Sequence, residues 1–159
     1  MNRWSDFLRD SMNQGAILLV EDNADDVELA QLAFERNGIS NELVVAWDGA
    51  EALDYLFGSG IHSDRDIAQL PALMLLDLKL PKMNGLEVLR QVRSNRNTEL
   101  MPVVILTTSQ VEQDVSEGYK SGANSFVVKP LGFEQFSEII KHLSKYWLEL
   151  NEPPPMVRA

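Results

Sequence analysis

The chain has 159 residues, a formal net charge of -10 and no cysteine, which predicts one domain and excludes disulfides and thiolate metal sites. It shows no cluster of Lys and Arg, so we expect no direct binding to nucleic acid or to an anionic membrane. No run reaches the ~20 apolar residues needed to cross a bilayer, and residues 1–15 lack the apolar core of a signal peptide. These features predict a cytoplasmic protein.

The two ends differ from the middle of the chain. Residues 1–15 form an N-terminal extension in which Trp4, Phe7 and Leu8 recur at a helical spacing. A short amphipathic helix and a frayed terminus both fit this pattern. We expect the domain over residues 16–150 and a Pro-rich C-terminal tail over residues 151–159.

Between these ends, apolar runs too short for helices alternate with longer segments of helical period, in five pairs. The pattern predicts an α/β fold, a single doubly wound (βα)5 flavodoxin-like domain. In folds of this class the parallel sheet takes the order 2-1-3-4-5. The predicted strands are residues 17–20, 43–46, 73–76, 103–106 and 125–128.

Several signals predict where the helices begin and end. Asp48 with Glu51, and Ser109 with Glu112, have the spacing of capping boxes. Asp25 and Asp26 suit the first turn of the first helix, and we assign them no chemistry. The connection over residues 58–69 is either a flexible loop or a partner-specific insertion. In the last helix an apolar stripe runs to Leu150, and its aromatic end could pack on a second subunit.

Polar side chains stand where the buried strands end. Glu21 and Asp22 follow the first strand, and Asp77 follows the third. Asp77 alone could be a turn cap. In the expected strand order the first and third strands are neighbours, so the three carboxylates should converge at the carboxyl edge of the sheet. A hard divalent cation relieves their repulsion, and Mg²⁺ is the expected cofactor.

Two further side chains complete the predicted site. Thr107 follows the fourth strand and Lys129 follows the fifth. A metal, a hydroxyl and an ammonium around one carboxylate can neutralise a phosphoryl group as it arrives. Asp77 would then be the nucleophile that forms an aspartyl phosphate.

These residues lie in motifs that resemble those of the receiver domains of two-component response regulators. The resemblance covers about residues 16–148. It rests on Val20-Glu21-Asp22-Asn23, Leu75-Leu76-Asp77-Leu78-Lys79-Leu80-Pro81-Lys82-Met83-Asn84-Gly85, Leu106-Thr107-Thr108-Ser109, and Gly122-Ala123 with Phe126 and Lys129-Pro130. Within that family the chain looks most like the stand-alone regulators of bacterial phytochrome histidine kinases.

The resemblance implies a role for each site residue. Asp77 would be the phosphoacceptor and Asp22 a direct Mg²⁺ ligand, with Glu21 acting on the metal largely through water. The backbone carbonyl of Lys79 would complete the protein ligands. Thr107 and Phe126 would form the switch pair, Lys129 would pair with the phosphoryl oxygens, and Lys79 and Ser109 would tune the phosphoryl lifetime.

The resemblance also implies partners. A histidine kinase, of the bacterial phytochrome type, would supply the phosphoryl group. The protein would catalyse only its own phosphorylation and dephosphorylation, so it is not expected to be an enzyme. With no room for an output domain after the last helix, it would signal by contact, through the face made by the fourth helix, the fifth strand and the fifth helix. That face would also form a homodimer, and a histidine phosphotransfer protein or another target would be the recipient.

Three other readings compete with this one. A flavodoxin would have a phosphate-binding loop after its first strand, where this chain has the repelling pair Glu21-Asp22. A haloacid-dehalogenase-type phosphatase would have a second acid where Lys79 stands. A pseudo-receiver would act as an interaction module without phosphorylation. Four intact site residues argue against it: Asp22, Asp77, Thr107 and Lys129.

Overall fold

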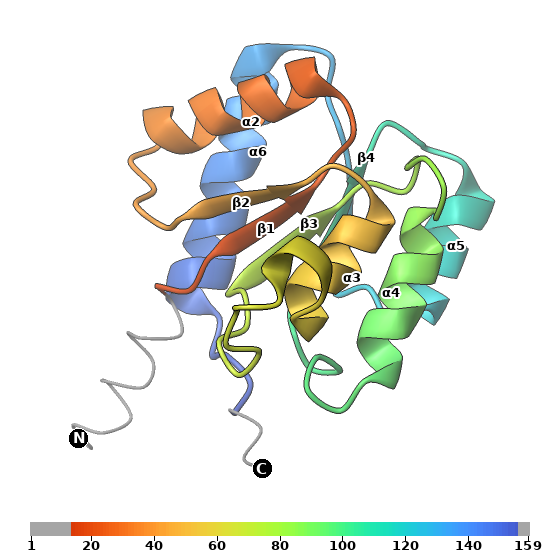
Figure 1. Ribbon diagram of the computed structural model, residues 1–159. Coiled ribbons are helices and arrows are strands. Elements are labelled where there is room, and N and C mark those ends of the chain that lie inside the picture. The colour runs from red at the N-terminus through yellow and green to blue at the C-terminus, as the bar shows by residue number, and fades with distance from the viewer. Residues whose placement is uncertain (1–13, 156–159) are drawn as a thin grey trace.

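The computed structural model describes residues 14–155, and over this range it has one five-stranded parallel sheet between two layers of helices (Figure 1). The sheet order is β2-β1-β3-β4-β5, which confirms the predicted fold and strand order. The strands are β1 (Ile17–Val20), β2 (Leu43–Ala46), β3 (Leu73–Leu76), β4 (Val103–Thr107) and β5 (Ser125–Val128).

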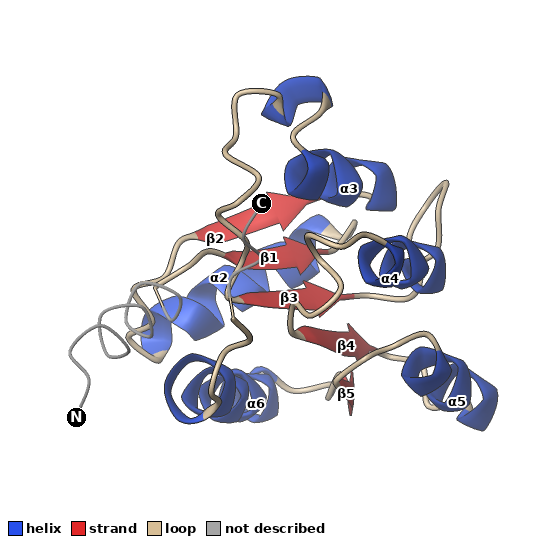
Figure 2. Cartoon of the chain, turned by 90° about the horizontal axis from the view of Figure 1, so that it is seen from below, coloured by secondary structure: helices blue, strands red, loops and turns tan. Residues whose placement is uncertain are grey.

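Helices cover both faces of the sheet. The layer on one face consists of α2 and α6, and the layer on the other consists of α3, α4 and α5 (Figures 1 and 2). Their bounds are α2 (Ala24–Arg36), α3 (Gly49–Phe57), α4 (Gly85–Ser94), α5 (Glu112–Lys120) and α6 (Phe133–Ser144). None of the helices in residues 14–155 has the length and apolar character of a membrane span.

The central strands are apolar throughout because both of their faces are buried. In β1, Ile17 and Leu19 belong to the core against α2 and α6, whereas Leu18 and Val20 belong to the core against α3 and α4. All four side chains are at most 4% exposed. Successive side chains of a strand point to opposite faces of the sheet, so the alternation also determines toward which face the first side chain after the strand points.

The helix starts follow the capping signals in part. Asp48 accepts a hydrogen bond from the N–H of Glu51 at 2.8 Å, as predicted for α3. The predicted capping box of Ser109 and Glu112 is wrong, because α5 begins after Val111 without a side-chain cap. Residues 109–111 form no regular structure and α5 begins only at Glu112, and the Ser109 hydroxyl donates instead to Asp114 at 2.5 Å.

The end of the last helix also differs from the sequence pattern. A π-helical segment, Lys145–Leu150, follows α6 and the chain becomes extended at Asn151. A π turn holds more residues than an α turn, so it rotates the side chains that follow. Leu148 is therefore buried and Leu150 is 61% exposed, contrary to the apolar stripe predicted to run through Leu150.

The long connection after α3 is fastened to the domain by Arg65. Its guanidinium lies 3.7 Å from the centroid of the Tyr55 ring and donates to the carbonyl oxygens of Tyr55 and Gln69. A short 3-10 helix, Gly60–His62, precedes it. These contacts show an ordered connection, while its possible use as a partner-specific insertion stays a prediction.

Arg93 connects two loops at the amino ends of β4 and β5, on the side of the sheet away from the acidic residues. From the last turn of α4 its guanidinium donates to the carbonyl oxygens of Glu99 at 2.9 Å and Met101 at 2.7 Å. It also donates to the carbonyl oxygen of Gly122 at 2.8 Å and to the side chain of Asn124 at 2.9 Å. The C-terminal end of α5 is thereby joined to the loop before β4.

Candidate functional site

Strand register brings the predicted site residues together. Val20 of β1 pairs with Leu76 of β3, so the next residues, Glu21 and Asp77, lie side by side at the carboxyl edge of the sheet. The same rule applies to β4 and β5, where Thr107 pairs with Val128 and the N–H of Lys129 donates to the Thr107 carbonyl oxygen at 2.7 Å. Four strand ends therefore contribute to one site.

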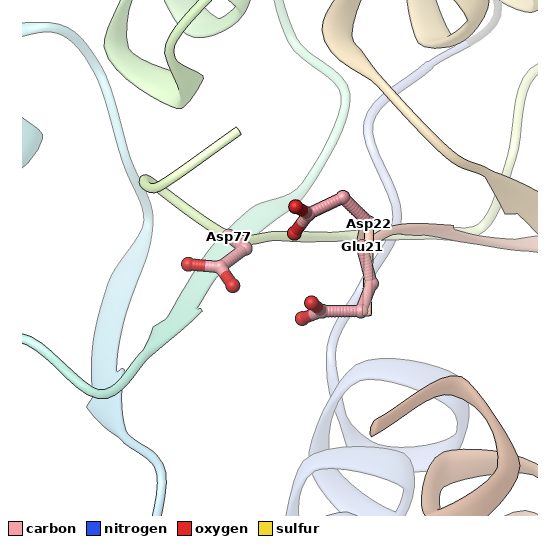
Figure 3. A group of neighbouring side chains, drawn as sticks. All are labelled: Glu21, Asp22 and Asp77. Carbon is pink, nitrogen blue, oxygen red and sulfur yellow. The ribbon is translucent and has the colours of Figure 1, made fainter. Parts of the chain in front are cut away.

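The acidic residues form a compact group. One carboxylate oxygen from each of Glu21, Asp22 and Asp77 lies within 4.8 Å of the others. Figure 3 shows the side chains of Glu21 and Asp22 extending toward Asp77. Glu21 is 3% and Asp77 9% exposed, whereas Asp22 is exposed to solvent. Oxygen ligands of this kind suit a hard divalent cation that keeps some of its water, so these residues fit the expected metal.

Lys129 lies on the buried side of the group. Its ammonium is 2.5 Å from Oε2 of Glu21 and 3.3 Å from Oδ2 of Asp77. Burial acts to lower the pKa of Lys129, but its hydrogen bond with Glu21 and the charges of the surrounding carboxylates outweigh burial and raise it. The Lys129 ammonium is therefore charged at neutral pH.

The pKa of Glu21 is raised from 4.5 to about 7. Burial is the largest cause, and the nearby charge of Asp77 adds to it, whereas Lys129 acts in the opposite direction. One ammonium has to serve several carboxylates, so it cannot fully compensate the most buried of them. Glu21 consequently gains or loses a proton near neutral pH as long as no metal is bound.

Thr107 and Phe126 lie on the other side of the sheet. By the alternation along β4 and β5, both side chains face α5, and a Cβ placed on Gly118 of that helix would lie 3.1 Å from the Phe126 ring. Thr107 is fully buried, and its hydroxyl accepts from the N–H of Ser109 at 3.4 Å. Asp77 thus has a cation on one side of the sheet and a hydroxyl on the other.

The loop after β3 packs tightly around Asp77. The N–H of Lys79 donates to Oδ1 of Asp77 at 3.2 Å, and the N–H of Gly85 donates to the carbonyl oxygen of Leu78 at 2.9 Å. A Cβ at Gly85 would overlap the carbonyl oxygen of Asp77. Only glycine allows α4 to begin this close to the strand end.

Asp26 is a neighbour of the site that the sequence did not indicate. We assigned this residue to the first turn of α2, yet its Oδ2 lies 3.5 Å from the ammonium of Lys129. Asp26 and Lys129 also line a pocket between α2 and residues 130–136. The sequence carried no signal for this contact, because it depends on how α2 packs beside the end of β5.

Comparison with known proteins gives a consistent result. A profile of the response regulator receiver domain matches residues 17–141. The probable methanogenesis regulatory protein FilR2 of Methanothrix harundinacea is 41% identical over 138 residues, which cover 87% of this chain and 86% of that protein. The response regulator Rcp1 of Synechocystis is 35% identical over 133 residues, which cover 84% and 88%.

Solved structures agree with this. The phosphorylated cyanobacterial phytochrome response regulator RcpA has a TM-score of 0.82 at 35% identity, covering 89% of this chain and 99% of that one. The Mn²⁺-bound form of Rcp1 has a TM-score of 0.80 at 34% identity, with coverages of 89% and 99%. The bacteriophytochrome response regulator RtBRR is 53% identical with a TM-score of 0.72, with coverages of 89% and 84%.

The matched profile spans most of the chain, and these relatives are matched over most of their own length. Their likeness agrees with the strand order and with the acidic group at the ends of β1 and β3. The chain therefore belongs to the response regulator receiver domain family.

Proposed function

We propose that this protein is a response regulator that accepts a phosphoryl group on Asp77 in a Mg²⁺-dependent reaction. The observation that carries the proposal is the position of Asp77, a nearly buried carboxylate beside the carboxylates of Glu21 and Asp22 and 3.3 Å from the ammonium of Lys129. Family membership and the likeness to a phosphorylated relative support it. The protein acts on itself alone and turns over no separate substrate.

The transfer is a displacement at phosphorus. A carboxylate oxygen of Asp77 forms the new P–O bond, while the bond from phosphorus to the imidazole nitrogen of a phosphohistidine breaks and that nitrogen keeps the electron pair. Asp22 and Glu21 would hold the metal, Glu21 largely through water, with the backbone carbonyl of Lys79. When bound, the metal would supply positive charge for the phosphoryl oxygens, and Lys129, 3.3 Å from Asp77, would supply more.

The switch would run through Thr107 and Phe126. Both side chains face α5, so a hydroxyl that moves toward the phosphoryl group leaves space on the side where the aromatic ring packs. Lys79 and Ser109 flank the same place from the two adjoining loops, which supports their role in tuning the phosphoryl lifetime.

The kinase is expected to be of the bacterial phytochrome type, because RcpA and RtBRR, both described as phytochrome response regulators, share the fold at 35% and 53% identity. A homodimer would form through α5, β5 and α6, and a histidine phosphotransfer protein is a further expected partner. Val111, directly before α5, is 60% exposed and Tyr119 of α5 is 52% exposed, which supports a contact surface there. Light scattering at several concentrations tests the dimer, and a monomer throughout, with and without phosphodonor, would contradict it.

Intact mass spectrometry after incubation with Mg²⁺ and acetyl phosphate tests the central proposal. The wild type should gain one phosphoryl group only when Mg²⁺ is present, and Asp77→Asn should gain none. Asp25→Asn is the matched control, because it removes an exposed carboxylate outside the site and should be phosphorylated like the wild type. If neither acetyl phosphate nor a phosphorylated kinase modified the wild type, the protein would be a pseudo-receiver that acts only by binding.

A further inference from the structure

The ammonium of Lys129 has a third carboxylate partner, Asp26, which differs in kind from the other two. Its Oδ2 lies 3.5 Å from Nζ, and it comes from the first turn of α2, not from a strand end. A lysine ammonium has three N–H donors, so it can serve all three carboxylates. Of these partners, only Glu21 and Asp77 belong to the acidic group that can hold a metal ion in the described part of the chain.

A bound divalent cation would change this balance. It would share the carboxylates of Glu21 and Asp77 with Lys129, and the two cations repel each other across a distance of a few ångströms. Asp26 lies outside the acidic group, so its attraction for the ammonium remains when the metal is present.

The structure leaves space for Lys129 to turn toward Asp26. Both side chains line the pocket between α2 and residues 130–136. The side chain of Lys129 is 11% exposed and that of Asp26 42%, so Asp26 marks the solvent side of the ammonium. The flexible stem of lysine allows a small movement of the ammonium in that direction without a change in the backbone.

We propose that Asp26 is a positioning residue that receives the ammonium of Lys129 when a divalent cation occupies the acidic group. It thereby reduces the competition between Lys129 and the metal, and it keeps the ammonium beside Asp77. Asp26 contacts neither the metal nor the reacting atoms and acts through Lys129. The expected strengthening of metal binding by Asp26 does not depend on the proposed function. Its benefit for phosphorylation, through the ammonium kept beside Asp77, rests on the function proposed above.

Calorimetric titration with Mg²⁺ tests this role. Asp26→Asn should weaken Mg²⁺ binding about two- to fivefold more than Asp25→Asn, the range that corresponds to one partly exposed ion pair. Asp25 is the matched control because it is exposed in the same first turn and removes the same charge. Asp26→Glu, which keeps the carboxylate, should restore most of the affinity. In a Lys129→Gln background the difference between Asp26→Asn and Asp25→Asn should disappear.

Two results would overturn the proposal. One is equal weakening by Asp26→Asn and Asp25→Asn, which would mean that only overall charge matters. The other is an Asp26→Asn effect that persists in the Lys129→Gln background. These titrations contain no phosphoryl donor, so their result is separate from that of the mass measurement. A protein that shows the predicted Mg²⁺ differences but takes no phosphoryl group would support the role of Asp26 and overturn the proposed function.

Discussion

Mg²⁺ binding should depend on pH because of Glu21. A cation binds the ionised carboxylate, so a bound proton has to leave first. With the pKa of Glu21 at about 7, the dissociation constant is multiplied by one plus the ratio of protonated to ionised Glu21. That factor is about 11 at pH 6 and about 1.1 at pH 8, so binding should be about tenfold weaker at the lower pH. A Glu with its ordinary pKa of 4.5 would change the constant by only a few per cent.

Calorimetry at pH 6, 7 and 8 measures this dependence directly. At pH 7, titrations in buffers with different ionisation enthalpies should also show the release of about half a proton per bound Mg²⁺. Glu21→Gln should bind Mg²⁺ more weakly at pH 8 but with little dependence on pH and no proton release. A wild-type dissociation constant that is equal at pH 6 and pH 8, or a pH dependence that survives in Glu21→Gln, would refute the reasoning.

Three further predictions concern stability and local order. In the metal-free protein, Glu21 stays protonated in the folded state between pH 4.5 and about 7 and ionises when the chain unfolds. The free energy of unfolding should therefore fall by on the order of 3 kcal/mol as the pH rises through that window. Urea titrations should show a smaller fall in Glu21→Gln, and an equal fall in the variant would contradict this origin. Gly85→Ala should lower the free energy of unfolding by about 3 kcal/mol, because its methyl group meets backbone. Gly132→Ala is its control, since the methyl group there meets only a movable side-chain end, and equal losses in the two variants would argue against backbone overlap. Arg65→Ala should increase hydrogen exchange in the connection after α3 and leave Mg²⁺ binding unchanged. The exposed control Arg96→Ala should change neither hydrogen exchange nor Mg²⁺ binding. Unchanged exchange in Arg65→Ala would mean that other contacts hold the connection.

The sheet and the acidic group could be predicted because their signals are local. Runs such as Leu73–Leu76 are apolar on both faces and too short for helices, so they had to be central strands. Once the strand order is known, the equal lengths of β1 and β3 bring Glu21 and Asp77 to the same level. The sequence and the strand order together were enough to predict this part of the site.

The features that the sequence did not reveal depend on contacts between distant segments. Asp26 meets Lys129 only because α2 packs beside the end of β5, and the two residues are far apart in the chain. Ser109 donates to Asp114 and not to the predicted Glu112, because α5 begins at Glu112 itself and not at Ser109. The exposure of Leu150 follows from a single π-helical segment, which the spacing of apolar residues does not encode.

The contacts of Arg93 restrain the C-terminal end of α5 but not its N-terminal end. The C-terminal end of this helix is held through the carbonyl oxygen of Gly122, whereas its N-terminal end has no side-chain cap and depends on the hydrogen bond between Ser109 and Asp114. A shift of the loop after Thr107 would therefore move the N-terminal end of α5 more than the C-terminal end that Arg93 holds. The displacement would be greatest at Val111, at the exposed tip farthest from the hinge.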